Sequence, residues 1–214
     1  MKSAVIKNEK IRLYFWTTLV FAIFASIIFR QKFFNSQTFI TDSDALSQHY
    51  KAFIYYGRYL RSIFYNLFVN RKFIIPQFDI SIGEGSDIIH SLCYYVIGDP
   101  FSFISIFFTD DKSYVGFGLS GLLRLYAAFL SFAYMCYYFG KKSVPAVLAG
   151  GVSYCFIPIA LSIELQIFFI NPYVFLPLLI VGVNKIMRGE KPILYIAAVF
   201  FASLSNFYFF TCSY

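Results

Sequence analysis

Long apolar runs are the feature that most limits what this chain of 214 residues can fold into. A helix needs about 20 apolar residues to cross the hydrocarbon core of a bilayer. Charged residues make up only 14% of the chain, too few to cover the surface of a soluble domain of this size. We therefore predict an all-α polytopic membrane protein, with the lipid bilayer as its surroundings. About five transmembrane helices are expected, over 13–29, 113–140, 143–161, 172–187 and 192–214.

The basic residues predict which side of the membrane each loop occupies. Segment 1–12 and the loops around 141–142 and 185–191 together hold nine Lys or Arg and two Glu, whereas segment 30–112 holds eight basic and eight acidic residues. Because short cytoplasmic loops are rich in Lys and Arg, we expect a cytoplasmic N-terminus and an extracytoplasmic segment 30–112. The net charge of +7 then lies on the cytoplasmic face, so no nucleic-acid partner is needed to explain it.

Both ends of the chain bear on this topology. The first apolar run follows a basic region, as in a signal peptide, but it is longer than a typical signal-peptide core and no A-x-A cleavage site follows it. We interpret this run as a retained membrane anchor. At the other end the chain stops at Tyr214 inside an apolar run, which is expected of the N-terminal part of a longer protein.

Segment 30–112 holds most of the charged residues, and the sequence predicts that chemistry is located there. From Lys51 onward, apolar residues recur every three or four positions, at Phe53, Tyr56 and Leu60, which predicts an amphipathic helix. We expect this helix to lie along the membrane surface, where Arg58 can bind a phosphate through its bidentate fork. Ordinary contact with lipid headgroups is the alternative interpretation of Arg58.

The stretch from Ile88 to Phe108 is also apolar, but Gly98-Asp99-Pro100 interrupts it. If this stretch crossed the bilayer, the basic loops that follow it would face outward, against the charge bias. We expect two short interfacial helices instead, with their aromatic side chains at the level of the lipid headgroups.

Nucleotide and zinc motifs are absent from the sequence. Gly83-Glu84-Gly85-Ser86-Asp87 is a glycine-rich turn with two carboxylates, but it lacks the third glycine and the βαβ setting of a dinucleotide fingerprint. The four cysteines show no paired spacing of the kind that holds zinc. The absence of a nucleotide motif favours a donor substrate that is not a soluble nucleotide.

Several motifs keep a characteristic order along the chain. Together these motifs, which extend over most of the chain, resemble the bacterial YfhO family of membrane proteins. They are Asp44-Ala45-Leu46-Ser47-Gln48-His49-Tyr50, Gly83-Glu84-Gly85-Ser86-Asp87, Tyr94-Tyr95-Val96-Ile97-Gly98-Asp99-Pro100-Phe101, Arg124-Leu125-Tyr126-Ala127 and Ser205-Asn206-Phe207-Tyr208-Phe209.

This resemblance implies a fold and an activity. The family is similar to glycosyltransferases of the GT-C type, in which the first outer loop carries a catalytic Asp. It implies a sugar donor carried on a polyprenyl phosphate and a cell-envelope glycopolymer acceptor, lipoteichoic acid in particular, at the bacterial plasma membrane. Family members are several-fold longer than this chain, so the chain alone is expected to be inactive.

The resemblance also implies roles for the residues around Asp44. Asp44 holds the position of the catalytic carboxylate, where it would act as the general base for the acceptor hydroxyl. Asp42 forms a D-x-D arrangement with Asp44 that could hold a divalent metal, and two solvated carboxylates are the alternative. We expect His49 to orient Asp44 or to contact the donor phosphate, unless it only lies at the interface. Gln48 is placed with them as a substrate-binding residue.

Other substrate-binding candidates lie further along the outer segment. Glu84 and Asp87 are expected to line the acceptor or donor pocket, with a plain turn as the alternative. Tyr94 and Tyr95 are expected to stack on a sugar, with anchoring at the membrane interface as the alternative.

Arg124 lies inside the predicted span 113–140, about 11 residues or roughly 16 Å from its outer end. A charge at this depth is costly and is by default a functional candidate. We expect Arg124 to bind the lipid phosphate, or to pair with Glu164 or an Asp. Snorkelling of the side chain to the outer surface is the alternative.

Two other functions compete with the glycosyltransferase. The chain could belong to a flippase or transporter of lipid-linked glycans, or to a non-catalytic accessory subunit. Transporters often carry internal repeats and broken helices near the midplane of the membrane. Because the sequence shows no convincing repeat and its polar residues gather outside the first span, the enzyme is favoured.

Overall fold

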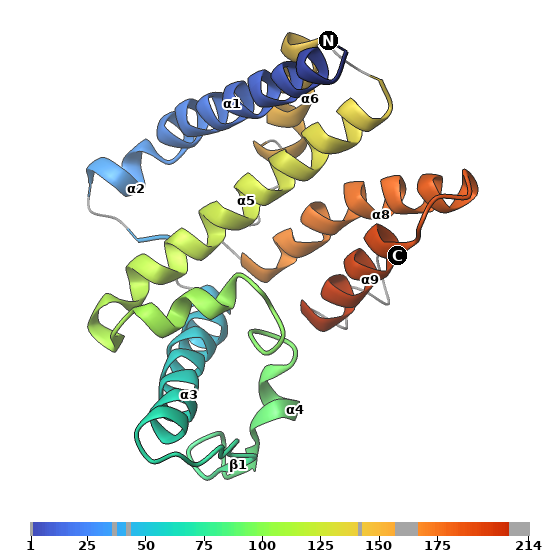
Figure 1. Cartoon of the computed structure of the whole chain (residues 1–214). Coiled ribbons are helices and arrows are strands. Elements are labelled where there is room, and N and C mark those ends of the chain that lie inside the picture. The colour runs from blue at the N-terminus through green and yellow to red at the C-terminus, as the bar shows by residue number, and fades with distance from the viewer. Residues whose placement is uncertain (1, 36–37, 42–43, 141–142, 157–166, 206–214) are drawn as a thin grey trace.

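In the computed structural model, which describes residues 2–35, 38–41, 44–140, 143–156 and 167–205, the chain is built almost entirely of helices (Figure 1). The elements in chain order are α1 (Lys2–Ile28), α2 (Arg30–Phe34), a π-helical turn η1 (Ala45–His49), α3 (Tyr50–Phe68), β1 (Phe78–Asp79), β2 (Ser86–Asp87), α4 (Ile88–Leu92), the 3₁₀ turns η2 (Ser102–Phe107) and η3 (Asp110–Lys112), α5 (Ser113–Tyr138), α6 (Val144–Phe156), a 3₁₀ turn η4 (Ile167–Ile170), α8 (Asn171–Met187) and α9 (Ile193–Ser205).

Three helices among the described residues are long and apolar enough to cross a membrane. They run over Glu9–Ile28, Asp110–Tyr138 and Ile167–Met187, and α6 and α9 are shorter apolar helices. The all-α membrane fold predicted from the sequence is therefore confirmed. The predicted spans 143–161 and 192–214 extend past the described residues of α6 and α9, so their full lengths stay predictions.

The long helix α5 lies at the centre of the arrangement. It packs against α1, α6 and α8, and α9 packs on α8 (Figure 1). At one end of α5, α3 and η2 cover the helix, and this end carries the residues that the sequence assigns to the outer segment. Helix α1 is continuous from Lys2 to Ile28 and includes the N-terminal basic residues.

The amphipathic helix predicted from Lys51 onward is present as α3. Its apolar residues Phe53, Tyr56 and Leu60 are buried. The rings of Tyr50 and Phe53 both lie edge-on to the ring of Phe117 in α5, with centroids 5.6 Å apart in each pair. This part of the apolar face therefore packs on protein, where the sequence analysis expected lipid.

The stretch from Ile88 to Phe108 contains two short helical pieces, α4 and η2. Between them the chain turns inward, and Val96 and Asp99 are fully buried. Asp99 meets Arg124, which is about three helical turns into α5. Irregular backbone at such a depth is tolerated in a membrane protein where it is buried in protein, as it is here.

Two structural constraints require glycine at position 98 of the Gly98-Asp99-Pro100 motif. Its backbone has a φ of 82°, which L side chains rarely adopt. A Cβ at Gly98 would also come within 2.5 Å of the backbone oxygen and Cγ of Leu204 in α9. The motif is thus a tight turn placed against a neighbouring helix.

Candidate functional site

Asp44 immediately precedes η1, the single π-helical turn that leads into α3. Such turns are rare in proteins, and those that do occur are often found at functional sites. The side-chain amide of Gln48 donates a hydrogen bond from Nε2 to Oδ1 of Asp44 at 3.0 Å. The turn therefore holds the predicted catalytic carboxylate against a second predicted site residue.

Tyr95 extends this contact from a segment 47 residues further along the chain. Its hydroxyl donates to Oε1 of Gln48 at 2.6 Å, so the amide of Gln48 links a phenol to a carboxylate. The ring of Tyr94 lies edge-on to that of Tyr95, with centroids 4.9 Å apart. Four of the residues that the sequence singled out, Asp44, Gln48, Tyr94 and Tyr95, are thereby brought together.

His49 lies beneath this cluster with 2% of its surface exposed. Its ring is 5.5 Å from that of Tyr95 and 5.1 Å from that of Phe168. Burial lowers the pKa of His49 to about 4, although the nearby carboxylate of Asp44 acts in the opposite direction. The imidazole is therefore neutral at neutral pH, and its Nδ1 has no hydrogen-bond partner in the described structure.

Arg58 lies on the exposed side of α3 and pairs with Asp110. Its Nε and a terminal nitrogen both approach Oδ2 of Asp110 at 2.7 Å. Arg61 reaches Oδ1 of the same carboxylate at 3.2 Å and also donates to the backbone oxygen of Phe108 at 2.5 Å.

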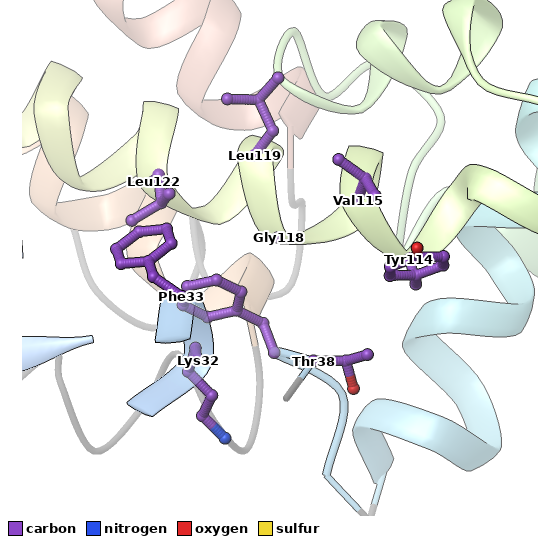
Figure 2. Close-up of a pocket in the computed structure, with 9 residues that line it drawn as sticks. Lys32, Phe33, Thr38, Tyr114, Val115, Gly118, Leu119 and Leu122 are labelled. Carbon is purple, nitrogen blue, oxygen red and sulfur yellow. The ribbon is translucent and has the colours of Figure 1, made fainter. Parts of the chain in front are cut away.

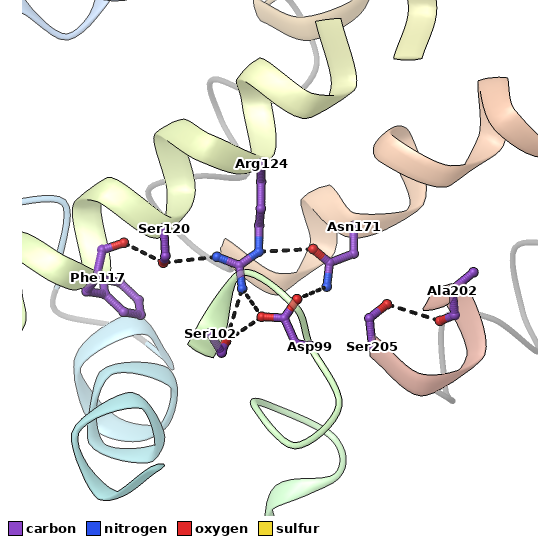
Figure 3. A network of polar contacts seen from close by, with 8 residues as sticks. All are labelled: Asp99, Ser102, Phe117, Ser120, Arg124, Asn171, Ala202 and Ser205. Carbon is purple, nitrogen blue, oxygen red and sulfur yellow. Dashed lines mark hydrogen bonds and ion pairs between the residues drawn. The ribbon is translucent and has the colours of Figure 1, made fainter. Parts of the chain in front are cut away.

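Arg124 is the centre of a buried polar network that joins three segments of the chain (Figure 3). It forms an ion pair with Asp99, and it donates to Asn171 Oδ1 at 3.0 Å, to Ser120 Oγ at 3.0 Å and to Ser102 Oγ at 3.2 Å. Asn171 in turn donates to the other oxygen of Asp99 at 3.0 Å. Both charged side chains are completely buried. The network supplies the hydrogen bonds that a buried ion pair needs to offset its loss of water.

Aromatic rings connect this network to the cluster around Asp44. The guanidinium of Arg124 lies 5.3 Å from the ring of Phe101 and 5.0 Å from the ring of Phe168. Phe168 also packs against His49, so one ring separates the buried cation from the candidate catalytic turn.

From the sequence we expect Glu164 or an Asp as the partner of Arg124, but Asp99 is not singled out. Gly98-Asp99-Pro100 is interpreted there only as a break between two helices. The signal that could have found the partner is the position of Asp99, an isolated carboxylate within an otherwise apolar, aromatic stretch. Glu164, the other predicted partner, lies outside the described residues.

Glu84 and Asp87, two other predicted residues, are not members of this network. Glu84 is exposed in the turn between β1 and β2. Asp87 caps α4 by accepting a hydrogen bond from the backbone N–H of His90 at 2.6 Å. Asp42 is outside the described residues, and within the described ranges no three His, Cys, Asp or Glu side chains gather as metal ligands. The divalent-metal site therefore stays a prediction.

Comparison with known families identifies the chain. Residues 16–210 match the family described as bacterial membrane protein YfhO. The chain belongs to the YfhO family. This confirms the resemblance carried by the sequence motifs, and the YfhO match includes all the site residues placed above. Neither a curated protein nor a solved structure gave a match.

Proposed function

We propose that this chain forms part of a membrane glycosyltransferase that transfers a sugar from a polyprenyl-phosphate donor to a cell-envelope polymer such as lipoteichoic acid. Transfer would occur on the extracytoplasmic face of the bacterial plasma membrane, with the N-terminus in the cytoplasm. The hydrogen-bonded series Asp44–Gln48–Tyr95 is the observation that supports this proposal most directly. Membership of the YfhO family supports a role of this kind.

The proposed reaction is an inverting displacement at the anomeric carbon of the donor sugar. The acceptor hydroxyl attacks that carbon, and its proton passes to the carboxylate of Asp44. The bond between the anomeric carbon and the donor phosphate oxygen breaks, and the lipid phosphate leaves with the electron pair. Gln48 would position Asp44, because its amide hydrogen bond fixes the direction of the carboxylate.

The leaving phosphate needs positive charge nearby. His49 does not supply it at neutral pH, because its pKa of about 4 leaves the ring uncharged. Arg124 and Arg58, the two cations that the sequence assigned to substrate binding, are each paired with a carboxylate of the chain. Arg58 is exposed and can exchange Asp110 for a phosphate, whereas the completely buried Arg124 would have to break its network.

Replacing Asp44 with Asn in the full-length protein tests the proposal. Loss of a general base is expected to lower transfer by about 10²–10⁴-fold, while protein abundance is unchanged. The measurement is the amount of sugar on the envelope polymer. Asp111→Asn is the matched control, because Asp111 is an exposed carboxylate of the same segment.

The competing functions give different results. Unchanged glycosylation with Asp44→Asn would remove Asp44 as the base and would favour an accessory subunit. A flippase would instead leave the donor lipid trapped on the inner leaflet, which labelling of the lipid on each side of the membrane detects.

A further inference from the structure

A groove runs between α2 with Thr38 and Phe39 on one side and the outer part of α5 on the other (Figure 2). Its volume is about 430 Å³, which lies within the usual range for small-molecule sites. Its walls are mostly apolar and its polar side chains are few. The lining residues are Lys32, Phe33, Thr38, Phe39, Tyr114, Val115, Gly118, Leu119 and Leu122.

The close packing beneath the groove gives it a definite shape. The ring of Phe39 lies against Gly118, where a Cβ would come within 2.6 Å of the ring. Phe39 also packs edge-on against Phe29 and Phe33, with centroids 5.2 Å and 6.2 Å apart. Phe39 is therefore held against α5 and α2 by these contacts, and the groove is built by side chains that have fixed partners.

The charge in the groove lining is positive. Lys32 is the only charged residue of its lining, and Figure 2 shows its ammonium and the hydroxyl of Thr38 directed away from the apolar side chains of Leu119 and Leu122. A ligand that fits this arrangement has a hydrocarbon part for the α5 wall and an anionic group for the α2 side. A lipid phosphate has both parts.

The groove lies close in the chain to the candidate catalytic turn. Thr38 and Phe39 line the groove, and Asp44 follows them in the chain. On the other side of the turn, the ring of Tyr50 packs on Phe117 in the same stretch of α5. A lipid in the groove therefore contacts the stretch of α5 that also packs against Tyr50, next to the turn.

We propose that this groove holds the hydrocarbon chain of the polyprenyl-phosphate donor, with Lys32 facing its phosphate. This inference rests on the proposed function and assigns the lipid part of its donor to a site. It also supplies a cation that, unlike Arg124, does not belong to the buried network.

The test uses the full-length protein in nanodiscs and a polyprenyl phosphate that carries a photoreactive group in its isoprenoid chain. Labelling is expected in peptides that contain residues 33–39 and 115–122. Unlabelled polyprenyl phosphate should compete for the site, whereas phosphatidylglycerol and inorganic phosphate at equal concentration should not. Equal competition by phosphatidylglycerol would mean that ordinary membrane lipid fills the groove, and it would overturn the proposal.

Two pairs of variants make the test specific. Leu119→Trp fills the groove and should lower labelling by about tenfold, which corresponds to about 1.4 kcal/mol. Leu123→Trp is its control, because Leu123 is as exposed as Leu119 (37% and 38%) and does not line the groove. Lys32→Gln should lower labelling several-fold, and Lys72→Gln, at an exposed lysine elsewhere in the outer segment, should not. Equal labelling within each pair contradicts the proposal.

Asp44→Asn separates this inference from the proposed function. The photoreactive lipid should label this variant as strongly as the unchanged protein, while sugar transfer falls by about 10²–10⁴-fold. If Asp44→Asn transfers sugar normally, the assignment of the base fails and the labelling result still locates the lipid. If labelling falls outside the groove while Asp44→Asn is inactive, only the groove assignment fails.

Discussion

Arg124 and Arg58 each pair with an aspartate, but the two pairs lie in opposite surroundings. Arg124 and Asp99 are completely buried, and two serines and an asparagine complete their hydrogen bonds. The side chains of Arg58 and Asp110 are 62% and 44% exposed. A buried charge cannot exchange its partner for water, whereas an exposed charge can. The first pair therefore fixes the position of the chain around Asp99, and the second is free to respond to a ligand or to salt.

Removing the carboxylate from the buried pair should have the largest effect. Asp99→Asn leaves the charge of Arg124 uncompensated and is expected to cost about 3–5 kcal/mol. Thermal unfolding of the full-length protein in detergent, together with its abundance in the membrane, measures this. The double variant Asp99→Leu with Arg124→Met should recover most of the loss, because it removes both charges. A fully stable Asp99→Asn protein would show that the pair does not hold the turn in place.

Acid should destabilise the protein through His49, which lies next to the same buried region. The pKa of His49 is about 4 in the folded protein and 6.5 for an unperturbed histidine. As the pH falls from 6.5 towards 4, the unfolded state gains a proton that the folded state does not bind, so stability decreases across this window. The measurement is the unfolding temperature as a function of pH. His49→Phe should show a smaller decrease in unfolding temperature between pH 6.5 and 4. His90→Gln, at an exposed histidine, should leave it in place.

Tyr95→Phe should have an effect between those of the two arginine pairs. The hydroxyl of Tyr95 donates to Gln48, and a hydrogen bond of this kind contributes about 0.5–1.5 kcal/mol. Under the proposed function, sugar transfer should fall as well, because Gln48 loses the group that orients it. Tyr65→Phe is the control at an exposed tyrosine. Wild-type stability and transfer with Tyr95→Phe would remove this hydrogen bond from the site.

The smallest effect is expected from the exposed pair. Arg58→Gln should change the free energy of unfolding by less than about 1 kcal/mol, because water screens the pair and Arg61 still reaches Asp110. The difference from the unchanged protein should shrink further at high salt. Lys51→Gln serves as the matched control on the same helix. A loss as large as that of Asp99→Asn would contradict the distinction between the two pairs.

The sequence predicted those features that depend on neighbouring residues. The apolar runs predicted a helical membrane fold, and the spacing of Phe53, Tyr56 and Leu60 predicted the amphipathic helix α3. Periodicity alone does not distinguish a face covered by lipid from one covered by protein, so the burial of this face against Phe117 was not predicted.

The contacts within the candidate site depend on residues far apart in the chain. Gln48 meets Tyr95, and Asp99 meets both Arg124 and Asn171, across separations of 25 to 72 residues. Local sequence patterns do not predict contacts between residues so far apart. The sequence could indicate that Arg124 needs a carboxylate partner, because a charge inside a span is costly. It could not select Asp99 from the eight acidic residues of the outer segment.

The inward turn at Asp99 sets an order for assembly of the protein in the cell. The turn is synthesised before α5 and well before α8. Its carboxylate nevertheless needs Arg124 from α5 and Asn171 from α8. It can reach its final position only after both helices have entered the bilayer. Until then the newly made chain carries an aspartate without its partners, so segment 30–112 can complete its fold only after α8 has been made.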